Sequence, residues 1–242
     1  MRNSSRTWLY RANEAFAATL PAGARVLDAG AGDQPYRHLF AHCEYESADF
    51  ELVDKPYAKS TYVCSLEKIP TEDSRFDAII FNQVMEHLPE PLLALREFSR
   101  VLKPGGTMIC SAPLFYEEHE KPYDFYRYTQ FAWRHLMKEA GFEILSLEWM
   151  EGYFGTVAYQ LKTSSSYLPI RAYRAVPGLL GWLAVPVVIF CRIIFRVLAS
   201  FFYILDENGK HTSSGYPKNY LVIVRKPGPV ATQAEAPGNR AG

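Results

Sequence analysis

The segment 113–129 concentrates the side chains that are best suited to acid–base chemistry. It contains Glu118, His119, Asp124 and Arg127 among six aromatic residues. Because the pKa of an imidazole lies near neutrality, His119 is the candidate general base, and the adjacent Glu118 is the second catalytic candidate. In the alternative interpretation, Asp124 and Arg127 form an ion pair that fastens the segment, and His119 forms only a structural hydrogen bond.

A second pair of acid and imidazole, Glu86-His87, follows an apolar run at 76–82. It is another candidate for catalysis, although a role in shaping the entry to the next helix is the favoured interpretation. No group of residues has the sequence spacing that is typical of a metal site. The sequence therefore predicts no metal and argues against metal-assisted catechol chemistry.

A glycine turn, Asp28-Ala-Gly-Ala-Gly32, is the strongest local indication of a ligand site. Gly30 and Gly32 allow a sharp turn after a strand and a close approach of the backbone to a ligand. A dinucleotide fingerprint would have a third glycine at position 35, where this chain has Pro35. The carboxylate of Asp28 would repel a pyrophosphate. It would attract a cationic ligand, such as the sulfonium and ammonium groups of S-adenosylmethionine (SAM).

A second carboxylate, that of Asp49, closes a predicted strand at 44–49. A carboxylate at this place can accept hydrogen bonds from the two ribose hydroxyls of an adenosine. The simpler alternative is that Asp28 and Asp49 only cap the ends of strands. Their occurrence together at this spacing favours a nucleoside site.

Strands and helices alternate along the chain and must position these residues. A first strand runs from 25 into the glycine turn, and further strands are predicted at 44–49, 61–64, 76–82, 107–112, 142–149 and 220–224. Helices are predicted at 7–20, 36–42, 91–102 and 129–140. This alternation predicts an α/β fold, in which a mostly parallel sheet has helices on both faces.

In this order, the motifs resemble those of a class I SAM-dependent methyltransferase of the type 11-like group. The resemblance covers residues 25–149 and resumes at 220. It rests on Leu27-Asp-Ala-Gly-Ala-Gly32, Asp49, Leu66-Glu-Lys-Ile-Pro70, Phe76-Asp-Ala-Ile-Ile80, Asn82-Gln-Val-Met-Glu-His-Leu88, Leu102-Lys-Pro-Gly-Gly106 and Tyr220-Leu-Val-Ile-Val-Arg225. It implies a Rossmann-like sheet whose last strand is antiparallel to the others.

The resemblance also implies how SAM would be bound. Asp28, Gly30 and Gly32 would line the methionine part of SAM, and Asp49 would hold the ribose. Asn82 would end the fourth strand beneath the methionine part.

Ser65 and Leu66 would flank the adenine, on the same resemblance. The family often has an aspartate at position 65, and a serine forms a weaker hydrogen bond with the adenine amino group than an anion does. The segment 113–129 would overhang the SAM pocket. Methyl transfer from a sulfonium is a direct displacement, so the protein must align the reacting atoms and remove a proton if the acceptor is a hydroxyl.

A hydrophobic helical insertion at about 150–218 precedes the last strand, and the minimal fold does not require it. Residues 175–191 carry no charge, and 197–205 are apolar again. The hydropathy of this stretch approaches that of a membrane span. Because both flanks must rejoin one sheet, an odd number of membrane crossings is excluded.

Two prolines, Pro177 and Pro186, are expected to break the insertion into shorter helices. The segment 175–205 is then an interfacial or re-entrant helical hairpin on a membrane, a lid over the acceptor pocket, or a homodimer interface. Cations that could meet anionic headgroups favour the membrane contact. They are Arg171, Arg174, Arg192 and Arg196.

The bulk composition of the 242 residues indicates a globular protein, with 48% apolar and 21% charged residues. The 26 basic residues equal the 26 acidic ones, so no overall field attracts a nucleic acid, and a nucleic-acid partner is disfavoured. The four cysteines form no C-x-x-C pair, and the first ten residues have no apolar leader. We therefore expect a cytoplasmic protein, with peripheral contact to the cytoplasmic face of a membrane if the hairpin binds lipid.

The sequence thus predicts one methyltransferase domain at 1–226 and a disordered tail at 227–242, which is rich in proline, alanine and glycine. Its expected function is the transfer of a methyl group from SAM to the oxygen of a small molecule, a lipid or a lipid-linked glycan. The alternative is a non-catalytic protein of the same fold that acts as a membrane-associated binding or scaffold partner.

Overall fold

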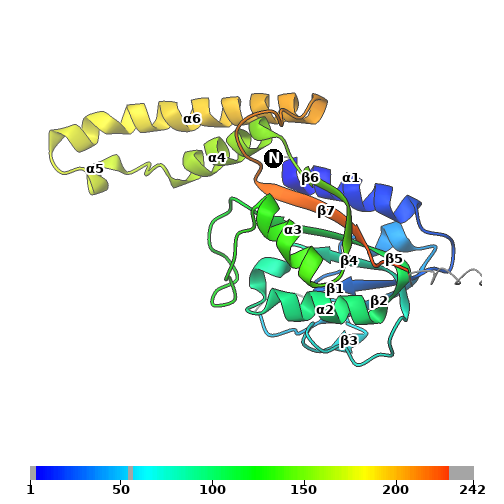
Figure 1. Cartoon of the computed structure of the whole chain (residues 1–242). Helices are drawn as coiled ribbons and strands as arrows, with labels where there is room; N and C mark the ends of the chain where they lie inside the picture. Colours follow the sequence, from blue (N-terminus) through cyan, green and yellow to red (C-terminus); the bar gives the residue numbers. More distant parts are fainter. Residues whose placement is uncertain (1–3, 54–56, 229–242) are drawn as a thin grey trace, which may run out of the picture.

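A seven-stranded sheet forms the centre of the computed structural model, which describes residues 4–53 and 57–228 (Figure 1). The strands are β1 Arg25–Ala29, β2 Glu44–Asp49, β3 Tyr62–Val63, β4 Phe76–Asn82, β5 Leu102–Pro113, β6 Glu143–Trp149 and β7 Asn219–Arg225. Most of the tail predicted to be disordered, from residue 229 onward, lies outside the described residues.

The strands lie in the order β3-β2-β1-β4-β5-β7-β6. Strands β1 to β5 pair parallel with one another, whereas β7 pairs antiparallel with both β5 and β6. The predicted fold class, a mostly parallel Rossmann-like sheet with an antiparallel last strand, is therefore confirmed.

Alternating side chains of the central strands fill two hydrophobic layers, one on each face of the sheet. In β4, Ile79 and Phe81 belong to the larger layer and Ala78 and Ile80 to the smaller one, and all four are fully buried. Successive side chains of a strand point to opposite faces, so a strand that is covered on both faces is apolar throughout.

Helices cover both layers. They are α1 Ser4–Ala18, α2 Pro91–Val101 and α3 Gln130–Glu139. Phe98 of α2 and Trp133 of α3 are buried in the larger layer, whereas Phe16 of α1 is buried in the smaller one. Thr129 caps α3, because its side chain accepts a hydrogen bond from the backbone N–H of Ala132.

The prediction of a full helix at 36–42 is wrong. This segment contains only a 3₁₀ turn, η1 Arg37–Phe40, and a second 3₁₀ turn, η2 Met85–His87, follows β4. A single turn is enough to bury the ring of Phe40, the one fully buried side chain of η1.

The insertion is a helical hairpin that projects beyond the sheet (Figure 1). Its helices are α4 Tyr153–Tyr167, α5 Ala172–Ala175 and α6 Leu179–Asn208. The expectation that Pro186 ends a helix is wrong, because α6 continues through it, whereas Pro177 does lie between α5 and α6. A proline removes only one backbone donor, and the turns on either side of Pro186 keep their own bonds.

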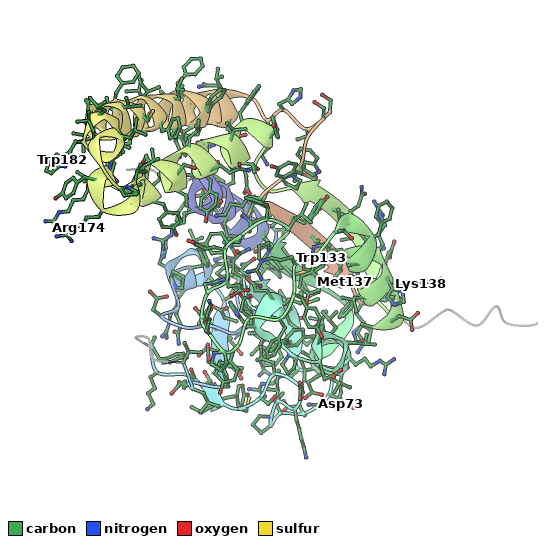
Figure 2. All side chains as sticks on the ribbon, turned by 90° about the vertical axis from the view of Figure 1, so that its left-hand side faces the viewer. Asp73, Trp133, Met137, Lys138, Arg174 and Trp182 are labelled. Atoms are coloured by element: carbon green, nitrogen blue, oxygen red, sulfur yellow. The ribbon has the colours of Figure 1, made fainter. Side chains whose placement is uncertain are left out.

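The helix α6 is long and apolar enough to cross a membrane, and only 11% of its most apolar stretch of 18 residues is buried. Leu179 and Leu180 at its start are 74% and 70% exposed. Figure 2 places Arg174 and Trp182 at the end of the hairpin far from the sheet, where Trp182 stacks on Tyr173 with ring centroids 4.3 Å apart. The hairpin thus presents an apolar surface that no other described residue covers.

The base of the hairpin is fastened to α1 through the buried carboxylate of Asp206. One of its oxygens accepts hydrogen bonds from Ser4 Oγ at 2.9 Å and from Trp8 Nε1 at 3.0 Å. The carboxylate reaches α1 because Gly152, the N-cap of α4, and Gly155 in its first turn have no side chains: a Cβ atom on them would lie 2.7 or 2.4 Å from its oxygens. This contact joins the base of the hairpin to α1.

Candidate active site

The glycine turn lies at the carboxyl end of β1. The Gly30 backbone has φ +76°, and a Cβ atom there would lie 2.4 Å from Val84 Cγ2, so no other residue fits between β1 and the loop after β4. Gly32 also has a positive φ, and its backbone N–H donates to Asp49 Oδ2 at 2.8 Å. The turn therefore connects the ends of β1, β2 and β4.

The carboxylate of Asp49 is buried at the end of β2, with 3% exposure. Its second oxygen accepts the backbone N–H of Glu51 at 3.1 Å. The adjacent Phe50 meets Tyr123 edge to face, with ring centroids 5.6 Å apart. Tyr123 belongs to the segment 113–129, so this segment reaches over the end of β2, where the nucleoside is predicted to bind.

Asp28 is buried one residue before the end of β1 and accepts a hydrogen bond from the Tyr45 hydroxyl. Burial raises the pKa of the Asp28 carboxyl to about 7, and the charge of Asp49 also raises it, whereas the bond from Tyr45 lowers it. A bound cation, such as a sulfonium or an ammonium group, would stabilise the ionised form of this carboxyl.

Asn82 at the end of β4 has partners on two neighbouring elements. Its amide donates to Asn13 Oδ1 at 2.9 Å, and its oxygen accepts from Ser111 Oγ at 3.0 Å. Asn13 lies on α1, so this helix closes one side of the sheet edge. Sequence reasoning missed Asn13 and Ser111, because neither lies in a recognised motif.

Ser65 and Leu66 follow β3 and face in different directions. Ser65 is exposed, and its hydroxyl accepts the backbone N–H of Glu67 at 3.3 Å. The side chain of Leu66 is buried in the larger hydrophobic layer. The predicted adenine contacts of both residues remain predictions.

The ion pair between Asp124 and Arg127 is confirmed. The guanidinium binds both carboxylate oxygens, at 2.6 and 2.8 Å, and this hydrogen bonding holds the pKa of Asp124 down at about 2. The same carboxylate accepts the backbone N–H of His119 at 2.8 Å. The pair thus stabilises the segment 113–129, as the alternative interpretation required, and it also orients His119.

The segment is further attached to η2. The backbone carbonyl of Glu86 accepts the N–H of Phe125 at 2.8 Å, and the Tyr128 hydroxyl donates to the Met85 carbonyl at 2.9 Å. The two candidate regions for proton transfer, which the sequence separates, therefore form one structure.

Glu86, His87 and His119 converge at this attachment. The two imidazole centroids are 4.7 Å apart, and His87 Nε2 lies 3.9 Å from Glu86 Oε1. Burial raises the pKa of the Glu86 carboxyl to about 8, and neither of its oxygens has a hydrogen-bond partner among the described residues. Sequence spacing could not reveal this cluster, because the fold alone brings position 119 to positions 86 and 87.

Glu118 lies apart from this cluster. Its side chain is 76% exposed and forms an ion pair with Lys121 at 2.9 Å. The structure does not bring it to the buried groups, and its catalytic role remains an untested prediction.

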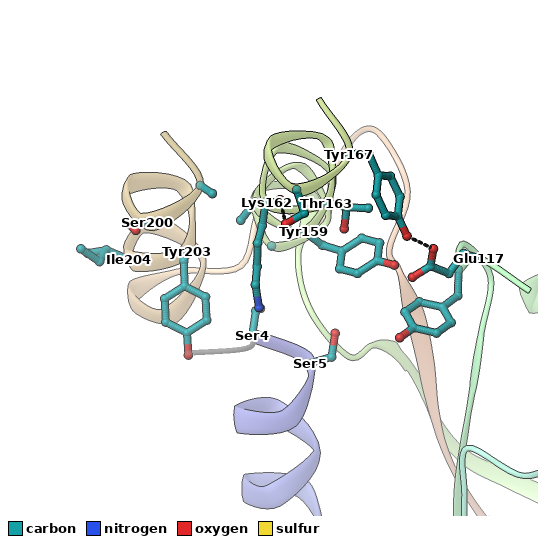
Figure 3. A pocket seen from close by; sticks show the side chains of 15 residues that line it. Ser4, Ser5, Glu117, Tyr159, Lys162, Thr163, Tyr167, Ser200, Tyr203 and Ile204 are labelled. Atoms are coloured by element: carbon teal, nitrogen blue, oxygen red, sulfur yellow. Dashed lines mark hydrogen bonds between the residues drawn. The ribbon is translucent and has the colours of Figure 1, made fainter. Parts of the chain in front are cut away.

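A cavity of about 590 Å³ lies between the hairpin, the start of α1 and the segment 113–129 (Figure 3). Tyr159 and Lys162 of α4, Tyr203 of α6 and Glu117 of the segment lie on its wall, and the Tyr167 hydroxyl donates to Glu117. Asp28, Gly30, Gly32 and Asp49 do not line it.

Tyr116 connects this cavity to the histidine cluster. Its ring lines the cavity and meets the His119 ring edge to face, with centroids 4.8 Å apart. The buried ammonium of Lys218 lies 4.3 Å from the centroid of Tyr116 and 4.2 Å from that of Tyr159, and burial lowers its pKa to about 8. Lys218, which sequence reasoning missed, thus holds both aromatic walls in place.

Residues 4–147 match the family described as a methyltransferase domain. The chain belongs to this family. Its membership confirms the predicted enzyme class and cofactor, a methyltransferase that depends on SAM. The family match ends before the hairpin, so the hairpin lies outside it.

Known methyltransferases share this sequence pattern or this fold. The ubiquinone/menaquinone biosynthesis C-methyltransferase of Burkholderia multivorans is 28% identical over 144 residues, or 52% of this chain and 59% of that protein. The chain thus spans about three-fifths of the length of the curated relatives it matches.

Two solved structures have the same fold at 16% sequence identity. One is the 1,6-didemethyltoxoflavin-N1-methyltransferase of Burkholderia thailandensis with bound 1,6-didemethyltoxoflavin and S-adenosylhomocysteine, with a TM-score of 0.52 over 90% of this chain and 78% of that one. The other is phosphoethanolamine N-methyltransferase 2 of Haemonchus contortus with SAM, with a TM-score of 0.54 over 90% and 52%.

Replacing Asp49 with alanine tests the nucleoside site of the methyltransferase. We expect Asp49→Ala to weaken SAM binding by about 10- to 100-fold, because the ribose hydroxyls lose a charged acceptor. Titration calorimetry measures the affinity, and circular dichroism checks the fold. Asp73→Ala, at a side chain that is 75% exposed, is the control. Equal affinity of Asp49→Ala and the wild type would contradict the assignment.

The raised pKa of Asp28 predicts a pH-dependent affinity for SAM. Below pH 7 the buried carboxyl is mostly protonated, so a cationic ligand must bind to a minor, ionised form. We expect SAM to bind about 10-fold more weakly at about pH 6 than at about pH 8. Calorimetry with Asp28→Asn should give weaker but pH-independent binding, and a variant that keeps the wild-type pH dependence would refute the role of Asp28.

Proposed function

We propose that this protein transfers the methyl group of SAM to the oxygen of an amphipathic acceptor, a lipid or a lipid-linked molecule. The observation that carries the proposal is the cavity that separates the exposed apolar hairpin from the segment bearing His119. An acceptor with one apolar and one polar end fits between these two surfaces.

The wall of the cavity supports an amphipathic acceptor. Ala158, Ala199 and Ile204 of the hairpin supply apolar contacts. Lys162 and Glu117 supply charged groups from opposite sides, so a polar head can be oriented by hydrogen bonds while the apolar part extends along the hairpin.

The hairpin supports delivery of the acceptor from a membrane. Large apolar side chains on α6 are exposed to solvent, including Trp182 at 63% and Phe190 at 62%. Arg171 and Arg174 at the tip are exposed and can meet anionic headgroups. Both ends of the hairpin join adjacent strands of one sheet, because Trp149 of β6 is paired with Tyr220 of β7, so we propose that it lies on the cytoplasmic face of the membrane without crossing it.

The histidine cluster supports oxygen as the methylated atom. A hydroxyl must lose its proton as it attacks the methyl group, and His119 is the imidazole that contacts the cavity wall through Tyr116. We therefore propose that His119 accepts this proton. The Burkholderia multivorans relative is named for ubiquinone and menaquinone biosynthesis, which agrees with a lipid-soluble acceptor, although its name specifies methylation at carbon.

The membrane contact is tested with the double variant Trp182→Glu/Phe190→Glu. Withdrawing two large apolar side chains from lipid should lower partitioning by about 100-fold or more. Co-sedimentation with vesicles of phosphatidylcholine and phosphatidylglycerol measures this. Phe131→Glu, at a ring on α3 that is 73% exposed, is the matched control. Membrane binding would be contradicted if the wild type stayed in the supernatant. It would also be contradicted if the wild type formed a homodimer instead and the double variant, but not the control, disrupted that dimer.

The proton acceptor is tested with His119→Ala. Tritium-labelled SAM is incubated with a total lipid extract, and label in the organic phase is counted. We expect the variant to lose about 100-fold or more in rate while its SAM affinity is unchanged, because only proton removal is affected. His135→Ala, at an exposed position of α3, is the control. Failure of the wild type to label any lipid would refute the acceptor class, and an unaffected His119→Ala would remove His119 from the mechanism.

A further inference from the structure

We infer that Glu86, His87 and His119 form a binding site for a divalent transition-metal ion. This inference goes beyond the proposed function and does not depend on it, since metal binding requires neither SAM nor an acceptor. It rests on the convergence of three ligands, on an unpartnered buried carboxylate and on the hydrogen bonds that orient the two imidazoles.

The three side chains each offer one ligand atom, and these atoms lie within 4.8 Å of one another. Around a bound ion with bonds of about 2.0–2.2 Å, ligand atoms are roughly 3–3.6 Å apart. Modest rotations of the side chains close this difference. His119 is 28% exposed and lies on a surface segment, so its ring has room to rotate.

The carboxylate of Glu86 is an independent indication of a ligand. Its side chain is fully buried, and neither oxygen has a hydrogen-bond partner among the described residues. A buried carboxylate without a partner is costly, and native proteins rarely retain one without a reason. The neighbouring Arg127 cannot serve as its full partner, because both arms of its guanidinium bind Asp124. A cation between Glu86 and the imidazoles accounts for this arrangement.

The imidazoles are oriented as metal ligands usually are. Nδ1 of His87 is hydrogen-bonded to the Tyr123 carbonyl, and Nδ1 of His119 lies 3.2 Å from the Glu117 carbonyl. When Nδ1 carries the proton and donates it to a carbonyl, Nε2 is left with a free lone pair for an ion. Nε2 of His87 lies 3.9 Å from Glu86 Oε1 and 3.9 Å from Glu120 Oε2.

Two imidazoles and one carboxylate suit zinc, iron(II) or cobalt(II) rather than calcium or magnesium, which prefer oxygen ligands. Glu120 can add a fourth ligand. An ion bound to Nε2 of His119 would exclude a proton from the same atom. His119 would then act as a proton acceptor only in the metal-free protein.

Cobalt(II) provides the test, because its visible absorption reports ligation by nitrogen and oxygen. The full-length protein is freed of metal with a chelator and titrated with cobalt(II) in the absence of SAM. We expect one ion per chain and displacement by zinc. Glu86→Gln and His119→Ala should each lower the affinity at least about 10-fold. The second variant guards against a folding defect of the first, because Glu86 is fully buried whereas the side chain of His119 is 28% exposed.

Matched controls lie on α3. His135→Asn and Glu139→Gln change an exposed imidazole and an exposed carboxylate, and they should leave the titration unchanged. A wild type without a stoichiometric spectral change would overturn the inference, as would an equal loss of affinity in the control variants. Neither result depends on methyl transfer, so failure here is distinguishable from failure of the proposed function.

Discussion

Buried carboxylates without a full counter-charge are the constraint on which the site depends. Asp28 and Glu86 lie at the carboxyl ends of β1 and β4, and burial raises the pKa of both carboxyls to about 7 and about 8. Arg127, the cation near Glu86, is engaged by Asp124. This sheet edge therefore favours cationic ligands over phosphates, as a sulfonium cofactor requires and as a metal ion beside Glu86 would.

The segment 113–129 reaches over this edge. It is attached to η2 through the Glu86 carbonyl, and Tyr123 packs on Phe50 beside the predicted ribose position. At its other end Tyr116 forms part of the wall of the cavity below the hairpin. One segment thus contacts both the sheet edge and the cavity, and the ion pair of Asp124 with Arg127 stabilises it between these two contacts.

The hairpin depends on a polar contact although its surface is apolar. Asp206 binds Ser4 and Trp8 of α1, and it can reach them only because Gly152 and Gly155 have no side chains. Fixed in this way, the hairpin forms one wall of the cavity while the apolar face of α6 remains exposed. The family match ends at residue 147, so the hairpin lies outside the part of the chain that matches the methyltransferase domain.

The sequence by itself determined the sheet, its helical cover and the glycine turn, because an apolar run such as Phe76–Asn82 and glycines at positive φ are local requirements of the backbone. Tertiary structure alone decided that α6 continues through Pro186, because a missing donor is a local cost that neighbouring turns can offset. It also decided that Glu86 and His119 meet. Their approach depends on long-range packing of the segment 113–129 against η2, and the spacing of residues in the sequence does not predict such packing.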